Sequence, residues 1–163
     1  MAGKQAVFVR PATPADLHVL VTLNAIVQAL HVRLEPDEFK AEVDAAELRA
    51  FFASLLDKPE NDLLIAEQSA EPVGYLWYEL QERPPTVLTQ ARRRIYIQDI
   101  AVREPARRAG VATALLRAVE AAATALQVDR LVLDAWTRNE EALRFFQGRG
   151  FRPFNVVLAK ALR

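Results

Sequence analysis

A strand, a turn containing arginine and glycine, and a helix follow one another in the second half of the chain. Residues 95–102 read IYIQDIAV and favour a buried β-strand, whereas residues 113–120 read TALLRAVE and favour a helix. The turn between them, 107–112, reads RRAGVA. Backbone N–H groups converge where a helix follows such a turn, and the helix dipole adds positive potential there. Because Gly110 and Ala112 leave this backbone uncovered, the turn predicts a site for a pyrophosphate group.

Two spaced motifs resemble those of the GNAT superfamily of N-acetyltransferases. Residues 107–112 match the first signature, Gln/Arg-x-x-Gly-x-Gly/Ala. Residues 139–151, NEEALRFFQGRGF, match the second signature, Asn-x-x-Ala-x-x-Phe-Tyr-x-x-x-Gly-Phe, except that Phe146 stands in place of the tyrosine. The opening VRPATPADL, residues 9–17, also resembles the family's first strand and helix cap. The resemblance extends from about residue 7 to 162, so we expect a single N-acetyltransferase domain within residues 1–163.

The composition is typical of one globular domain and limits the kinds of site and partner that we expect. The 163 residues are 52% hydrophobic and 26% charged, and a chain of this length buries roughly 70% of the surface that it exposes when unfolded. There is no cysteine and there are only two histidines, so we expect no disulfide framework and no metal. The net charge of zero argues against a dedicated nucleic-acid-binding protein. No secretory or membrane segment is recognised, which predicts a cytoplasmic protein with neither a nucleic-acid nor a membrane partner.

The expected elements follow the order β-α-α-β-β-β-α-β-α-β. Thr13 caps the first helix with Pro14 at its first position, and Pro36 ends that helix. The other elements are expected as strands at 7–10, 63–67, 73–79, 95–102, 130–136 and 156–162, a hairpin turn at 69–72, and helices at about 37–56, after 113 and after 139. This order is that of the α/β GNAT acyl-CoA N-acyltransferase fold, a mixed sheet with helices on both faces.

The resemblance implies acetyl-CoA as the acyl donor. In the family the sheet opens after the strand equivalent to 95–102, and the pantetheine arm of CoA pairs with the backbone left free there. The residues expected to bind CoA lie at the end of this strand, in the turn and in the last helix: Ile100, Ala101, Val102, Arg107, Arg108, Ala109, Gly110, Val111, Ala112, Thr113, Asn139 and Phe146. Two arginines at a helix N-terminus oppose its dipole unless an anion is present, which favours a phosphate site. Asn139 either only caps the last helix or also contacts CoA.

The motifs leave the catalytic residues open. Acetylation of an amine, whose pKa is about 10, needs a proton acceptor, and the departing thiolate needs a proton. Strand alternation predicts Tyr96 and Gln98 on one face and Ile97 and Asp99 on the other. Asp99 and Gln98 are the predicted catalytic residues, acting through a water chain, although Asp99 could equally be a buried acid bonded to backbone. Phe146, at the position of the family's tyrosine acid, cannot protonate a thiolate. Further candidates are Glu79, Tyr78 and His31.

The resemblance therefore implies an acetyl-CoA-dependent N-acetyltransferase in which a primary amine attacks the thioester directly. Ten acidic residues against three basic ones between residues 35 and 67 favour a small cationic acceptor. The run 95–99, IYIQD, is similar to that of the diamine and polyamine branch, although Gln98 replaces its glutamate. The alternatives are a weakly catalytic acyl-CoA sensor, a protein or peptide N-acetyltransferase, and a nucleic-acid-binding domain using the arginines at 92–94, which lack an accompanying aromatic platform. Homodimers are common in the family, so a homodimer is compatible with the resemblance.

Overall fold

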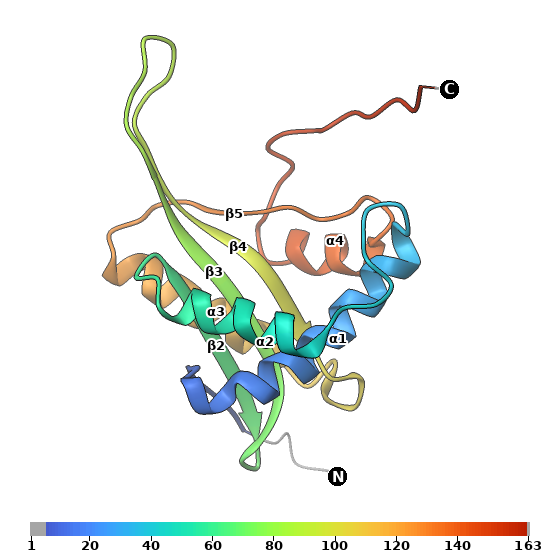
Figure 1. Ribbon diagram of the computed structural model, residues 1–163. Coiled ribbons are helices and arrows are strands. Elements are labelled where there is room, and N and C mark those ends of the chain that lie inside the picture. The colour runs from blue at the N-terminus through green and yellow to red at the C-terminus, as the bar shows by residue number, and fades with distance from the viewer. Residues whose placement is uncertain (1–5, 163) are drawn as a thin grey trace.

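The computed structural model describes residues 6–162 as a five-stranded sheet with helices on both faces (Figure 1). The strands are β1 (Val7–Pro11), β2 (Asn61–Gln68), β3 (Glu71–Arg83), β4 (Arg92–Val102) and β5 (Leu131–Leu133). The helices are α1 (Leu17–Leu34), α2 (Ala45–Leu56), α3 (Val111–Ala125) and α4 (Glu140–Gln147). The strands lie in chain order, antiparallel except for the parallel pair β4–β5. The mixed α/β architecture expected from the sequence is confirmed.

Two apolar clusters hold the helices to the sheet, one on each face. Leu20 of α1 and Phe52 of α2 are buried together with Tyr75 of β3. On the other face, Leu115 of α3 is buried with Leu76, the next residue of β3. Neighbouring residues of a strand point to opposite faces, so β3 contributes to both clusters. A central strand that is apolar on both faces is what a sheet between two helical layers requires.

The N-terminal half begins as expected, but its second helix starts later. Thr13 forms a capping box with Asp16 at a short 3₁₀ turn that leads into α1, and α1 ends before Pro36. The prediction of a second helix from about residue 37 is wrong, because α2 begins at Ala45. Asp44 caps α2: its carboxylate accepts hydrogen bonds from the N–H groups of the second and third residues that follow it, at 2.9 and 2.8 Å.

Two hairpins build the centre of the sheet. Ser69 and Ala70, which join β2 to β3, both have positive φ angles, 51° and 64°. Positive φ at both central residues is the geometry of a two-residue hairpin, which confirms the hairpin predicted at 69–72. The second hairpin, β3–β4, extends well beyond the helices as a two-stranded arm (Figure 1). Pro84 and Pro85 follow the end of β3, where a residue without an N–H group breaks no ladder bond.

The predicted closing strand at 156–162 is wrong for the single chain. In the part of the chain that the structure describes, no strand follows α4, and residues 152–162 are exposed. The β-branched and apolar residues of this segment favour a strand, but a strand forms only when its backbone pairs with a neighbouring strand, and this segment pairs with none in the described chain. Here the segment leaves the sheet after α4 and runs outward (Figure 1).

One helical stretch, Pro14–Leu34, is long and apolar enough to cross a membrane by length and composition alone. The same stretch contributes Leu20 and Leu23, both fully buried, to the cluster against the sheet. Core helices of globular domains pass this test as well, so it is weak evidence for a membrane span. The absence of a membrane partner stays a prediction.

Candidate active site

The sheet opens between β4 and β5. The two strands pair only from Ile95 opposite Leu131 to Ile97 opposite Leu133. Beyond Ile97, β4 continues to Val102 paired with β3, and among the described residues no strand lies along its other edge. The cleft at this opening has a volume of about 1510 Å³, larger than the roughly 300–1,000 Å³ of common small-molecule pockets. The expectation that the sheet opens after this strand is confirmed.

All the residues predicted to bind CoA line this one cleft. Three segments supply them: the end of β4 (Ile100, Ala101, Val102), the turn and first residues of α3 (Arg107, Arg108, Ala109, Gly110, Val111, Ala112, Thr113), and the N-terminal cap and body of α4 (Asn139, Phe146). Gln98 and Asp99 line it as well. The parallel pairing of β4 with β5 brings α4 beside the start of α3, which places two distant sequence motifs on one cavity. That these residues bind CoA stays a prediction.

The N-terminus of α3 faces the cleft without a cap. Gly110 is the N-cap residue and has a left-handed conformation with φ of 90°, and Arg108 also has a positive φ, 63°. Within residues 6–162, no side chain bonds the free N–H groups at this end of α3. The N–H groups of residues 111–113 are therefore available to an anion, and the helix dipole favours one. A side chain at Gly110 would add conformational strain as well as bulk.

Cationic side chains gather around this helix end. Arg107 donates from Nε to the carbonyl oxygen of Val102 at 3.4 Å, so it lies over the end of β4. Arg149, which follows α4, donates from Nη2 to Oγ1 of Thr113 at 2.8 Å, and its guanidinium lies 5.8 Å from the centre of the Phe145 ring. Sequence reasoning missed Arg149, because it occupies a variable position of the second motif. A cluster of arginines beside a helix N-terminus is unfavourable unless an anion joins it.

A β-bulge turns Asp99 toward α1. A register shift in the β3–β4 ladder leaves Gln98 without a partner in β3. Before the bulge, Ile97 packs in the cluster beneath α3, whereas Asp99 bonds to Tyr75 and to Asn24 on the α1 face. An extra residue in one strand reverses the alternation of side chains beyond it. The prediction that Ile97 and Asp99 share a face is therefore wrong.

Asp99 is the accepting centre of a small hydrogen-bond network. Its Oδ2 accepts from the hydroxyl of Tyr75 and, at 3.1 Å, from Nδ2 of Asn24. Burial raises the pKa of Asp99, while the hydrogen bond from Tyr75 and the nearby imidazole of His31 oppose that rise. Burial also raises the pKa of Tyr75, which keeps its hydroxyl protonated and donating. A carboxylate whose pKa is raised is a stronger proton acceptor than an ordinary aspartate.

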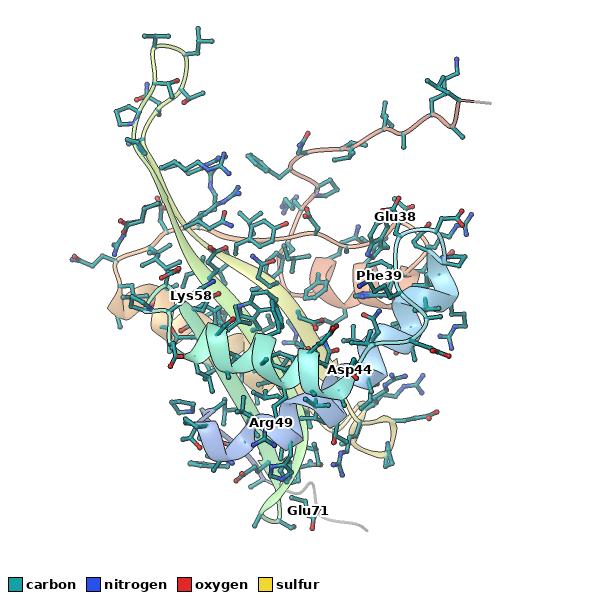
Figure 2. The ribbon with its side chains drawn as sticks, viewed as in Figure 1. Glu38, Phe39, Asp44, Arg49, Lys58 and Glu71 are labelled. Carbon is teal, nitrogen blue, oxygen red and sulfur yellow. The ribbon has the colours of Figure 1, made fainter. Side chains whose placement is uncertain are left out.

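Three aromatic side chains bridge one end of the cleft. The His31 ring of α1 lies 4.6 Å from the Phe39 ring, and Phe39 meets Trp136 edge-on at 5.4 Å. Phe39 sits in the loop between α1 and α2, near α4 (Figure 2). Arg138 strengthens the bridge by donating to the carbonyl oxygen of Leu34 at 3.1 Å. His31, a candidate from the sequence, thus lies in the cleft, and burial lowers its pKa. Neither Phe39 nor Trp136 belongs to a motif, so the sequence held no signal for the bridge.

The remaining polar candidates occupy different places. Tyr96 lines the cleft and donates to Asp134, and burial together with that carboxylate raises its pKa to about 12. Glu79 accepts from Nε2 of Gln98 at 3.0 Å. Tyr78 is buried in the cluster beneath α3, and burial with its hydrogen bond to Asp62 raises its pKa. Of these candidates, only Tyr96 and Gln98 border the cleft.

Both motif residues on α4 are held by local contacts. Asn139 caps the helix, because its Oδ1 accepts from the N–H of Ala142 at 3.2 Å, and it also lines the cleft. Phe146 is buried between the rings of Phe145 and Phe151, with centroids at 5.3 and 5.5 Å, and borders the cleft too. Across residues 6–162, His, Asp and Glu side chains form no cluster able to hold a metal ion.

Sequence comparison relates this chain to known proteins. The model of the acetyltransferase (GNAT) family matches residues 26–151 of the chain. The uncharacterized N-acetyltransferase YycN of Bacillus subtilis (strain 168) is 29% identical over 90 residues, 55% of this chain. That match spans 54% of YycN, about half its length.

Solved structures share the fold over nearly the whole chain. A tetramutant of the BH1408 protein from Bacillus halodurans superposes with a TM-score of 0.88 and 25% identity, covering 95% of this chain and 99% of that one. The aminoglycoside 6'-N-acetyltransferase AAC(6')-Ih from Acinetobacter baumannii gives a TM-score of 0.73 at 19% identity, covering 97% and 99%. The aminoglycoside N-acetyltransferase AAC(6')-Iy, solved with CoA, gives 0.76 at 16% identity, covering 100% and 99%. At these two lower identities the likeness concerns the fold.

Proposed function

This chain belongs to the acetyltransferase (GNAT) family, and we propose that it transfers the acetyl group of acetyl-CoA to a primary amine that attacks the thioester directly. One feature carries the proposal: the free edge of β4 beyond Ile97 leads directly to the uncapped N-terminus of α3. A free strand edge can pair with the amides of an extended ligand, and the helix end can hold its phosphates. Enzymes of this family use acetyl-CoA, and the fold neighbour AAC(6')-Iy was solved with CoA.

The residues of the cleft fit acetyl-CoA. When bound, this donor would supply an acetyl group activated as a thioester. The backbone of residues 100–102 would pair with its amide groups, and the N–H groups of residues 111–113 would hold its pyrophosphate. Arg108 and Arg149 would add positive charge at the same place, and Asn139 and Phe146 would border the ligand from α4. The arginines and the positive end of the helix dipole repel one another, and an anion bound at the site offsets this repulsion.

Asp99 is the proposed proton acceptor. The amine must lose a proton on becoming an amide, and Asp99 is a cleft carboxylate whose pKa is raised by burial. Tyr75 and Asn24 hold its Oδ2 and are positioning residues. Gln98, which lies beside Asp99 on the bulge, would hold a water on the path of the proton.

The proposed acceptor is a small cation. Asp99 adds negative charge to the cleft, and the faces of Phe39 and Trp136, which line it, attract ammonium groups. Structural neighbours that are named aminoglycoside acetyltransferases support an amine acceptor. The polyamine branch, suggested by the run 95–99, is one form of this proposal. From sequence alone we further propose a cytoplasmic location without nucleic-acid or membrane partners.

A matched series of primary amines tests the function and the charge of the acceptor together. Propylamine, 1,3-diaminopropane and β-alanine share a three-carbon chain and differ in carrying no second charge, a positive one or a negative one. We expect kcat/KM, measured by thiol release from acetyl-CoA, to be about tenfold or more higher for the diamine than for propylamine. The second ammonium group of the diamine would gain a desolvated cation–aromatic contact and the attraction of a nearby carboxylate, which together can supply a difference of this size. Equal values across the series would overturn the cationic acceptor. No thiol release with any amine, while CoA still binds, would favour an acyl-CoA sensor.

Phe146→Tyr tests whether the departing thiolate lacks an acid. The ring already borders the cleft between two phenylalanines, so a hydroxyl adds little volume. We expect kcat to rise by about tenfold or more, within the usual contribution of a general acid, with KM for acetyl-CoA unchanged. Phe145→Tyr is the matched control and should leave kcat as it is. An unchanged kcat in Phe146→Tyr would show that another group supplies the proton or that chemistry does not limit the rate.

A further inference from the structure

Three rings in a row, which we call the aromatic bridge, cross the cleft from one wall to the other: His31, Phe39 and Trp136. All three line the cleft. His31 and Phe39 belong to α1 and the loop that follows it, whereas Trp136 lies in the loop between β5 and α4. Ring centres 4.6 and 5.4 Å apart are in van der Waals contact, so a ligand cannot pass between the rings. An acceptor has to enter along the bridge, and the rings bound its path.

The bridge lies at the end of the cleft where the acetyl group would be. Among the described residues, the part of the β4 edge without a partner strand is 98–102, which leads from the opening of the sheet to the start of α3. This stretch spans roughly 16 Å, at about 3.3 Å per residue. With its pyrophosphate at residues 111–113, an extended acetyl-CoA would therefore place its thioester at the Asp99 end of the edge. His31 lies close to Asp99, and Trp136 follows the end of β5 where the sheet opens.

Hydrogen bonds fix the backbone that carries the two outer rings. The N–H of Phe39 donates to the carbonyl oxygen of Glu35 at 3.3 Å. Nε2 of Gln28, on α1, donates to the carbonyl oxygen of the residue that follows Phe39, at 2.8 Å. On the other wall, the carbonyl oxygen of Trp136 accepts from the N–H of Asn139, the cap of α4, at 2.8 Å. Because both loops are bonded at or beside the ring, the bridge is a fixed boundary that cannot easily give way to a wide ligand.

The chemistry of this boundary suits a narrow chain. Aromatic rings offer apolar surface to methylene groups, and their faces attract an ammonium group. Asp99 adds a carboxylate at the end of the path. A cyclic acceptor carries the same ammonium group but is wider, and forcing extra volume against fixed side chains is unfavourable by about 1–3 kcal/mol.

We propose that the aromatic bridge is a steric filter that admits unbranched aliphatic amines and excludes amines carried on a ring. The methylene groups of the acceptor lie against Phe39 and Trp136, and its terminal amino group reaches the Asp99 end of the cleft. This inference rests on the proposed N-acetyltransferase function and names the class of acceptor within it. Phe39 and Trp136 are then specificity-determining residues.

Thiol release with two diamines of equal charge tests the filter. In 1,5-diaminopentane and in 1,3-bis(aminomethyl)cyclohexane the same number of carbon atoms separates the two nitrogens, but only the second compound carries a ring. We expect kcat/KM of the wild-type chain to be about tenfold or more higher for the linear diamine. Phe39→Ala and Trp136→Ala should each lower this ratio to about threefold or less, because each opens the path to the wider amine. Lost attraction between cation and ring affects both diamines alike and cancels in the ratio.

Phe51→Ala is the matched control for the bridge variants. Phe51 is a half-exposed ring on α2 that meets Trp77 at 5.5 Å and lies outside the lining of the cleft. Its replacement should keep the wild-type ratio, and calorimetry with CoA checks that every variant keeps the donor site. Equal kcat/KM for the two diamines in the wild-type chain, or an unchanged ratio in both bridge variants, would overturn the filter and leave the transferase function in place. No thiol release with either diamine would contradict the proposed function itself, and the filter would fail with it.

Discussion

Asp99→Asn should lower kcat by about a hundredfold or more, the usual cost of removing a general base, without weakening CoA binding. The amide has the shape of the carboxylate and can still accept a hydrogen bond from Tyr75, but it cannot take a proton from the amine. The free edge of β4 and the start of α3 are untouched by the change. Thiol release measures kcat, calorimetry measures the Kd of CoA, and thermal unfolding checks the fold.

Asp134→Asn is the matched control for this variant. Asp134 is another carboxylate that lines the cleft, but it accepts a hydrogen bond from Tyr96 and lies at the end of β5. Its replacement should change kcat little. If both variants lose the same activity, or if Asp99→Asn stays active, Asp99 is not the proton acceptor.

The pH profile gives a second signature of Asp99. Only the ionised carboxylate accepts a proton, so kcat/KM should fall as the pH is lowered through the raised pKa of Asp99, above the ordinary value of about 3.9. The hydrogen bond from Tyr75 holds that pKa down, so Tyr75→Phe should move the acidic limb to higher pH. A limb that stays in place in Tyr75→Phe would contradict the assignment of Tyr75 as a positioning residue.

Gly110→Asp should weaken CoA binding by about tenfold or more relative to Gly110→Asn, because a like charge would face the pyrophosphate. The two side chains have nearly the same size and similar tolerance of the left-handed conformation that Gly110 adopts. Gly110 is the N-cap of α3, and aspartate at a cap favours the helix dipole. The aspartate variant should therefore be at least as stable as the asparagine variant while binding CoA less tightly. Equal Kd values of the two variants for CoA, measured by calorimetry, would show that the pyrophosphate does not bind at this helix end.

The fold follows from signals that are local in the sequence. The Thr13 cap and the hairpin turn at 69–72 each mark a boundary that the structure reproduces. The run 95–102 and the turn 107–112 predict a strand followed by a helix, and both are present. Every residue that these motifs predict to bind CoA lines one cleft. The parallel pairing of β4 with β5 places the two motifs side by side.

Departures from the prediction come from effects that no single segment encodes. The bulge at Gln98 arises from pairing with β3, and it alone decides that Asp99 faces α1. The bridge of Phe39 and Trp136 joins loops that lie far apart in the sequence. The segment 156–162 has the composition of a strand, but composition does not tell which edge will receive it. Side-chain direction, loop contacts and strand partners depend on the assembled sheet.

Amide hydrogen exchange with and without CoA tests the central claim most directly, that this cleft holds the cofactor. We expect slower exchange on CoA binding at residues 100–102, whose free edge would pair with the ligand, and at residues 110–113, whose N–H groups would bond the pyrophosphate. α2, which contributes no residue to the lining of the cleft, should not change. If CoA binds by calorimetry and exchange at both segments stays the same, the cofactor lies elsewhere and the account is wrong.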